Sequence, residues 1–397
     1  MKYSERVYRK LISEDATIMF IADKFGKKII MKVPSSTARA MLNGCKVELI
    51  IGRDDHISPS IIHSGLKIYD DPVNFIYLTG AHIHPNENKS LKDIMECGEC
   101  YVELYNEFSI CVANTRIYFN KNIREEILNL LGNLKNLYSG IFDDFVTSSL
   151  DSFDYTIDKR RKFKKPYDIK IHFSECVFDK WQTMTNHFIG LHEHNEIKLD
   201  DLDEGSVLEK QAWTSIEELF NFDIYKNPFF KTPDGNKELT DILAFYQYGI
   251  FLLETKALAI LSLEKEKSTE KKVASIKKQI RKGIKQLVGA KKNIEKGVEI
   301  YSPQGNLIEF ERNIVPHCIV LISELIVIGD WTDIENEILE TMRKESILLH
   351  VMDLREFMKY VKYCNRQKEI LDVNLIERIK IFVKTKNIHI RIQLENK

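Results

Sequence analysis

The pattern of apolar and polar positions is clearest in the middle of the chain. Two apolar runs, at residues 242–246 and 250–253, flank the short break Gln247-Tyr248-Gly249. Such runs joined by a tight turn are typical of a β-hairpin. Apolar side chains at helical spacing precede the hairpin at residues 203–220, and a long helical stretch follows at residues 271–296. The order helix, hairpin, helix is therefore predicted here.

Beyond Gly297, strand-like and helix-like segments alternate. The predicted strands are 313–328 and 347–352, the predicted helices are 333–344 and 354–363, and an alternating run at 388–393 predicts a closing edge strand. Together with the central hairpin, these segments predict an α/β domain over residues 200–397.

The first part of the chain has a different pattern. Strand-like runs occur at 17–33, where they form a hairpin, and at 46–51, 73–79, 100–105 and 108–119, before a helical period at 122–137. We therefore predict a separate β-rich α+β domain over residues 1–150, with a role in recognition or assembly. Residues 151–199 are expected to be a linker and connecting segment, because residues 159–165 place six basic side chains in seven positions before Pro166. Within that run, Phe163 could stack on a nucleic-acid base.

The central hairpin carries the most informative polar residues. A turn centred between Gln247 and Tyr248 places Asp241 directly opposite Glu254. Like charges at opposed positions destabilise a strand pair, so a cation is expected between them. Lys256 lies on the same strand face as Glu254, because side chains alternate along a strand. Two carboxylates beside an ammonium group suit Mg²⁺ and a phosphate-containing substrate.

These residues resemble the active site of the PD-(D/E)XK nuclease superfamily. Asp241 matches the aspartate of the first strand, and Glu254-Thr255-Lys256 matches the acidic-x-Lys motif, whereas Thr240 stands in place of the family's proline. The resemblance covers roughly residues 200–365 and implies a restriction-endonuclease-like core, a mixed sheet flanked by helices. It also implies that Asp241, Glu254 and the backbone carbonyl of Thr255 bind the metal, and that Lys256 is catalytic.

The family also places a glutamate on the helix before the hairpin. Glu209 is our choice for this metal-binding and catalytic acid, because Gly205 precedes it at the spacing found in the family. Glu217 and Glu218 lie on the same predicted helix and remain alternatives.

The helix after the hairpin is expected to contact the substrate. Gln279 and Gln286 are seven residues apart and share a helix face. By the resemblance, a glutamine on this helix contacts the active site or the DNA backbone; we assign Gln286 to the catalytic site and Gln279 to nucleic acid, and the choice between them stays open because no tyrosine follows either one. Residues 264–296 contain twelve Lys and Arg against four Glu. Such a basic patch suits a phosphate backbone. The predicted DNA-binding residues, besides Gln279, are Lys277, Lys278, Arg281, Lys282 and Lys285.

Two other groups of potential metal ligands have simpler interpretations. Cys97 and Cys100 lie shortly after His82 and His84, but the spacing matches no standard zinc finger, so reduced thiols are the preferred interpretation. The other group is His187, His192 and His194, for which no orienting partner is evident. We interpret these histidines as surface or interdomain residues.

Composition limits the class of protein. The chain has 397 residues, a formal net charge of −1 and seven cysteines, an odd number that does not indicate a disulfide framework. No apolar run approaches about 18 residues and the N-terminus lacks the apolar core of a signal peptide, so a cytoplasmic protein without a membrane span is expected. The chain lacks a phosphate-binding loop motif, so any ATPase activity would need a partner protein.

The sequence thus predicts a Mg²⁺-dependent DNA endonuclease, with Mn²⁺ able to substitute, acting in restriction or in defence against phages and plasmids. A homodimer or a larger even-numbered assembly is expected, because cutting both strands is most simply achieved by two symmetric centres. Two alternatives remain open. One is a catalytically silent nucleic-acid-binding or assembly subunit, and the other is a nuclease acting on RNA.

Overall fold

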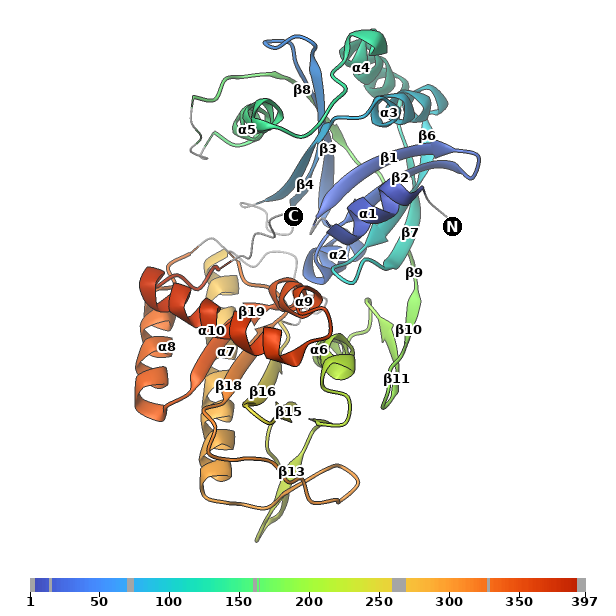
Figure 1. Cartoon of the computed structure of the whole chain (residues 1–397). Coiled ribbons are helices and arrows are strands. Elements are labelled where there is room, and N and C mark those ends of the chain that lie inside the picture. Colours follow the sequence, from blue (N-terminus) through green and yellow to red (C-terminus); the bar gives the residue numbers. More distant parts are fainter. Residues whose placement is uncertain are drawn as a thin grey trace. The chain divides into compact units, whose positions relative to one another are not determined.

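The chain forms two compact units, Met1–Met184 and Thr185–Lys397. The computed structural model in Figure 1 describes residues 4–13, 16–69, 75–159, 163, 165–258, 269–326 and 329–390. The architecture is α/β, with several sheets, mixed ones among them, flanked by helices.

The first unit contains two sheets. One has the strand order β1-β2-β6-β7-β9, in which β2 and β6 are parallel and the other neighbours antiparallel; the second is antiparallel, in the order β5-β4-β3-β8. The strands are β1 (Thr17–Asp23), β2 (Gly26–Lys32), β3 (Lys46–Asp54), β4 (Ile61–Tyr69), β5 (Ile76–His82), β6 (Glu99–Tyr105), β7 (Cys111–Tyr118), β8 (Lys170–Glu175) and β9 (Gln182–Thr183). The helices are α1 (Glu5–Ser13), α2 (Ser35–Leu42), α3 (Pro85–Cys97), α4 (Lys121–Leu131), the short η1 (Leu134–Asn136) and α5 (Asp144–Ile157).

The structure differs from the expected linker at residues 151–199. Helix α5 runs through position 150 and buries Phe153, while β8 pairs with β3 inside a sheet. The sequence of β8, Lys-Ile-His-Phe-Ser-Glu, has only two apolar residues, Ile171 and Phe173, which are too few to stand out as a strand in a polar segment. Most of the basic run lies outside the described residues, at 160–162 and 164.

The main sheet of the second unit contains the predicted hairpin. Its order is β12-β15-β16-β18-β19, with β15 antiparallel to β16, and β16, β18 and β19 parallel. Ile242 pairs with Leu253 and Tyr246 with Gly249, so the predicted hairpin register is confirmed. The strands are β12 (Ile224–Lys226), β15 (Ile242–Tyr246), β16 (Gly249–Lys256), β18 (His317–Ile322) and β19 (Leu348–Asp353).

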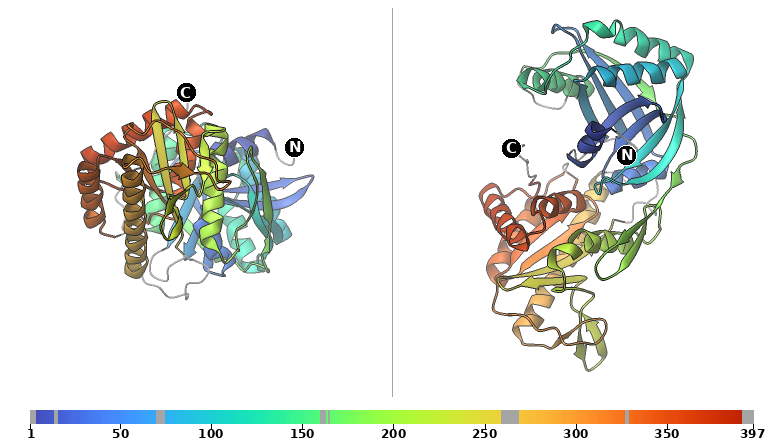
Figure 2. Two further views of the ribbon diagram at one scale, coloured as in Figure 1. Left: turned by 90° about the horizontal axis from the view of Figure 1, so that it is seen from below. Right: turned by 45° about the vertical axis from the view of Figure 1, so that its right-hand side comes forward.

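Helices cover both faces of this sheet (Figures 1 and 2). The helices of the unit are α6 (Glu204–Phe220), α7 (Thr269–Glu295), α8 (Thr332–Glu345), α9 (Leu354–Tyr363) and α10 (Lys368–Thr385). Apolar residues of α7 and α8 form one core with Leu252 and Val320 of the sheet. On the opposite face, Phe220 of α6 meets the Phe251 ring with a centroid separation of 5.0 Å. Burial of such side chains from both faces is what makes the central strands nearly continuous in apolar residues.

Smaller sheets complete the second unit. They are the hairpin of β10 (Thr185–Ile189) and β11 (His194–Lys198), and a three-stranded sheet of β14 (Gly235–Glu238), β13 (Phe229–Thr232) and β17 (Ile300–Tyr301). The closing strand expected at 388–393 is not formed at residues 388–390, and its remainder lies outside the described residues. No helix in the described ranges combines the length and apolar character needed to cross a bilayer.

Candidate metal centre and catalytic site

The carboxylate of Asp241 is fixed at the open end of the central hairpin. Asp241 directly precedes β15, and its Oδ2 accepts hydrogen bonds from the backbone nitrogen of Thr255 at 2.6 Å and from Thr255 Oγ1 at 2.7 Å. A further bond, from Thr240 Oγ1 to the carbonyl of Leu253 at 2.7 Å, ties the two strands together just before this point. The hairpin therefore positions Asp241 beside the predicted acidic-x-Lys motif.

Lys256 contacts two of the predicted metal ligands. Its Nζ donates to Glu254 Oε2 at 2.7 Å and to the backbone carbonyl of Thr255 at 2.9 Å. Leu252, two residues before Glu254 on β16, belongs to the core beneath α7. Because side chains alternate along a strand, the side chains of Glu254 and Lys256 project from the same face as Leu252. The oxygen atoms expected to hold a metal thus already surround a positive charge.

The negative charge of this centre is only partly balanced. Glu254 is 1% exposed, and burial together with the nearby charge of Asp241 raises its pKa to about 7, although Lys256 acts in the opposite direction. A carboxyl group with such a pKa is partly protonated near neutral pH. A divalent cation could take the place of that proton.

A further acid, Glu238, joins the cluster and was not predicted. It ends β14 and is exposed, and partial desolvation, the charge of Asp241 and a hydrogen bond to Asp241 raise the Glu238 pKa. Glu238 lies in a polar segment without an apolar period, so spacing alone gave no signal. The only sequence sign was its position three residues before Asp241.

Of the three candidate helix acids, Glu209 is the one on which the structure shows an effect of the Asp241 charge. Burial raises its pKa, and the charge of Asp241 contributes, while Lys226 opposes the shift. Asn227 Nδ2 donates to Glu209 Oε1 at 3.2 Å. Glu217 instead accepts the backbone nitrogen of His192 at 2.6 Å, and Glu218 pairs with Arg366 at 2.9 Å.

The donor atoms fit a magnesium ion that keeps several water ligands. Asp241, Glu254 and Glu209 do not all approach within 4.8 Å of one another; within the described parts of the chain, only His187, His194 and Glu196 form a group that does. Mg²⁺ in enzymes is usually held by one or two carboxylates, water and substrate phosphate. Asp241, Glu254 and the Thr255 carbonyl supply the hard oxygen atoms, so the residues present suit this ion.

The predicted DNA-binding helix divides into two sides. Lys277 Nζ contacts Asp333 of α8 at 2.5 Å, and Arg281 contacts Asp333 at 2.6 Å and Glu337 at 2.8 Å. These two side chains therefore join α7 to α8. The solvent-facing side carries Lys278, Lys282 and Lys285, all exposed.

The predicted glutamines of α7 do not form polar contacts with the acidic cluster. Gln286 is exposed and Gln279 half-buried, and neither has a hydrogen bond among the residues that the structure describes. Their assignments to the catalytic site and to DNA contact stay predictions.

The remaining histidines separate into distinct environments. Both ring nitrogens of His82 are within 2.9 Å of polar partners, Asn88 and Ser64, which leaves none for zinc. His192 contacts the backbone carbonyl of Asn221, whereas His187 and His194 meet each other and Glu196. The missing orienting partner is therefore Glu196, across the hairpin from His187.

Comparisons with known proteins show only remote similarity. No family model matches the chain, and no curated protein matches it. Among solved structures, the chain is similar to the small subunit of the heterodimeric restriction endonuclease R.BspD6I, with 15% identity, a TM-score of 0.26, and coverage of 45% of this chain and 87% of that one. This likeness is too low to carry an argument, so the chemistry of the site rests on the residues of this chain.

Proposed function

We propose that residues 185–397 form a Mg²⁺-dependent endonuclease that hydrolyses DNA phosphodiester bonds. The observation that carries the proposal is the arrangement at the hairpin, where Thr255 holds Asp241 and Lys256 bonds to buried Glu254. The raised pKa of Glu254, caused by burial and the charge of Asp241, supports it. A purely structural ion pair would leave the charges matched. An excess of carboxylate around one ammonium group instead favours a divalent cation.

The roles of the residues follow from their contacts. Asp241, Glu254 and the Thr255 carbonyl would hold the ion, and a bound Mg²⁺ supplies Lewis acidity and a water of lowered pKa. Lys256, already held beside Glu254, orients the attacking water and offsets negative charge that develops on the phosphate. Glu209 and Glu238 would bind the outer water molecules and accept protons from them.

Substrate binding is assigned to the exposed side of α7. Three exposed lysines recur at helical spacing on this side, Lys278, Lys282 and Lys285, and can contact successive phosphates of a DNA backbone. Such phosphate contacts do not depend on the base sequence. We further propose a two-fold symmetric assembly, because one such centre cuts one strand at a time. A role in restriction or in defence against phages and plasmids is proposed as the biological setting.

The test is cleavage by the purified full chain. Supercoiled plasmid and single-stranded RNA, at equal phosphate concentrations, are incubated with Mg²⁺, Mn²⁺ or EDTA, and a Glu254→Gln preparation controls for contaminating nuclease. We expect DNA cleavage with either metal and none with EDTA. Faster RNA cleavage would change the substrate class, and no cleavage of either polymer would favour a silent nucleic-acid-binding subunit. Light scattering on the same sample tests for a dimer.

A further inference from the structure

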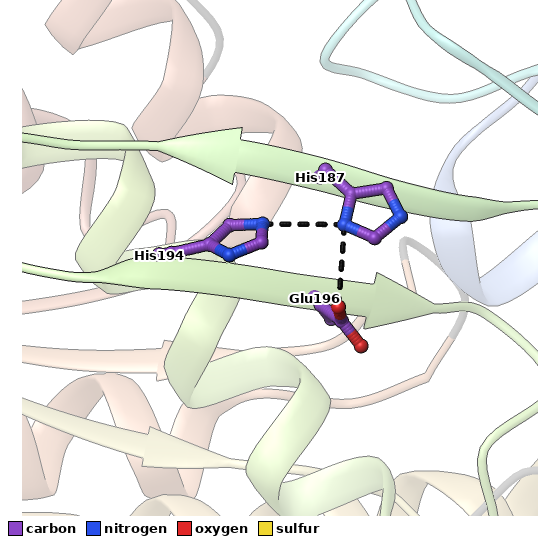
Figure 3. Close-up of side chains that lie close together, drawn as sticks. All are labelled: His187, His194 and Glu196. Carbon is purple, nitrogen blue, oxygen red and sulfur yellow. Dashed lines mark hydrogen bonds and ion pairs between the residues drawn. The ribbon is translucent and has the colours of Figure 1, made fainter.

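The hairpin of β10 and β11 gathers two imidazoles and a carboxylate on one face. His187 lies directly opposite Glu196, while His194 precedes Glu196 by two residues and so shares its strand face. His187 Nδ1 is 3.2 Å from His194 Nε2 and 3.3 Å from Glu196 Oε1. Figure 3 shows the two rings and the carboxylate directed toward one another from the two strands. One donor atom from each residue lies within 4.8 Å of the other two.

This arrangement of donors differs from that at the acidic centre. Two ring nitrogens facing each other can be bridged by a proton or by a metal ion, whereas two neutral nitrogens without a bridge repel through their lone pairs. Imidazole nitrogen suits Zn²⁺, Cu²⁺, Ni²⁺ and Fe²⁺, whereas Mg²⁺ prefers oxygen. Two histidines with one glutamate are a ligand set found for zinc in proteins.

The backbone around these residues is anchored without using their side chains. Lys210 of α6 donates to the backbone carbonyl of Glu196 at 3.3 Å, and Glu217 of α6 accepts the backbone nitrogen of His192 in the hairpin turn. Strand pairing and these contacts fix the backbone positions of the three residues. A metal ion therefore needs to order only side chains, which lowers the entropic cost of binding.

We propose that His187, His194 and Glu196 bind one zinc-type divalent cation. The ligand atoms are His187 Nδ1, His194 Nε2 and a Glu196 carboxylate oxygen. All three side chains are exposed, so the remaining coordination positions are open to water or to an added ligand. This site is separate from the proposed magnesium centre in its residues and in its preferred metal.

The test is metal binding by the full chain. Zn²⁺ affinity is measured by competition with a chromophoric chelator, and Co²⁺ is added as a spectroscopic substitute whose visible bands report nitrogen and oxygen ligation. The variants are His187→Ala, His194→Ala and Glu196→Gln. His192→Ala is the matched control, because this histidine lies in the same hairpin but contacts Asn221. Circular dichroism verifies that each variant folds, as expected for exposed positions.

We expect one Zn²⁺ per chain, with each histidine variant at least about 100-fold weaker in affinity, since losing a direct ligand costs more than losing a supporting contact. Excess Mg²⁺ should not displace the ion, and Asp241→Ala should bind it normally. Wild-type affinity in the His187→Ala and His194→Ala variants would overturn the proposal. Equal loss in His192→Ala, or loss in Asp241→Ala, would overturn it as well by placing the ion elsewhere.

Discussion

Each unit has a polar cluster built around a buried acid, and the two clusters differ in which groups balance the charge of that acid. In the first unit, Asp54, His63 and Ser149 are at most 1% exposed. Asp54 Oδ2 accepts bonds from Ser149 Oγ and Tyr167 OH, each at 2.6 Å, and Oδ1 accepts the backbone nitrogen of His56 at 2.9 Å. In the second unit, Glu254 is equally buried but faces another acid and one lysine.

The comparison separates a network in which every charge has a partner from a centre in which two acids share one lysine. Asp54, Ser149 and His63 have the residue types of a hydrolase triad, yet the Ser149 proton goes to Asp54, so His63 Nε2 must donate to Ser149 rather than accept from it. Burial also lowers the His63 pKa to about 3, which keeps the ring neutral. A carboxylate surrounded by donors is stable as it is, whereas Glu254 beside Asp241 would, under the proposed function, gain from a bound cation.

The largest expected difference between the clusters is in folding stability. Asp54→Ala should cost about 3 kcal/mol, because it leaves the buried donors Ser149 and Tyr167 without their acceptor. Asp241→Ala should change stability by less than about 1 kcal/mol, since the lost bonds to Thr255 are offset by relief of repulsion with Glu254. Urea denaturation followed by circular dichroism measures both. Equal destabilisation by the two variants would make the acidic cluster a structural network.

A second difference should appear in the pH dependence of stability. Folded Glu254 keeps its proton up to about pH 7, whereas the ordinary pKa of a glutamate side chain is 4.5, so the folded state binds more protons between these two pH values. Stability should therefore fall as pH rises through this window, by up to about 3 kcal/mol at about 1.4 kcal/mol per pKa unit.

The variant Glu254→Gln and added Mg²⁺ isolate this effect. Denaturation at pH 5.5 and pH 8 with EDTA should show a smaller pH dependence for Glu254→Gln than for the natural chain. Mg²⁺ at pH 8 should restore stability only where Glu254 is present. A stability that rises from pH 5.5 to pH 8 in the natural chain but not in the variant would contradict the charge imbalance.

How far the sequence predicted this site depends on the range of the interactions. The hairpin and its register followed from two apolar runs around Gln247 and Tyr248, because strand pairing across a tight turn is local. Helix α6 was predicted from the helical spacing of its own apolar side chains, which is also a local signal. Glu238 was missed because it ends β14, a wholly polar strand of a different sheet from β15, and so has no apolar period to mark it.

The charged side of α7 shows the same limit. Twelve basic residues in one stretch indicated a DNA-binding surface, but α8 lies more than fifty positions further along the chain and supplies Asp333 and Glu337 to Lys277 and Arg281. Only tertiary packing reveals which cations are already paired. The pairing of β8 with β3 was invisible for a similar reason, since it joins segments far apart in the sequence.

Lys256 gives a prediction on turnover rather than stability. Lys256→Ala should retain metal binding but lose about 100-fold in cleavage rate, equivalent to about 2.7 kcal/mol, because the ammonium acts on water and phosphate. Lys292→Ala is the matched control, since Lys292 contacts Glu345 at 3.0 Å, a residue with no role in the proposed site. Single-turnover rates at saturating Mg²⁺ compare them. Equal rates for Lys256→Ala and the natural chain would reduce Lys256 to an ion-pair partner.

The smallest expected effect concerns DNA affinity. Changing Lys278, Lys282 and Lys285 to Glu should weaken binding to all sequences alike and reduce the salt slope by roughly 3, about one per phosphate contact. Lys277→Ala with Arg281→Ala should leave that slope unchanged, because these side chains bind α8. Fluorescence anisotropy at several salt concentrations measures both. A larger slope change for the second pair would place the DNA on the other side of α7.

The most direct test of the central claim is cleavage by variants of the two opposed acids. Plasmid DNA is cut under single-turnover conditions by the natural chain, Asp241→Ala and Glu254→Ala, at equal folded concentration and saturating Mg²⁺. The account predicts at least about a thousandfold loss in each variant, since a lost metal ligand removes several kcal/mol of transition-state stabilisation. The far-ultraviolet circular dichroism should stay unchanged. Wild-type cleavage by either folded variant would contradict the assignment of the hairpin as the catalytic centre.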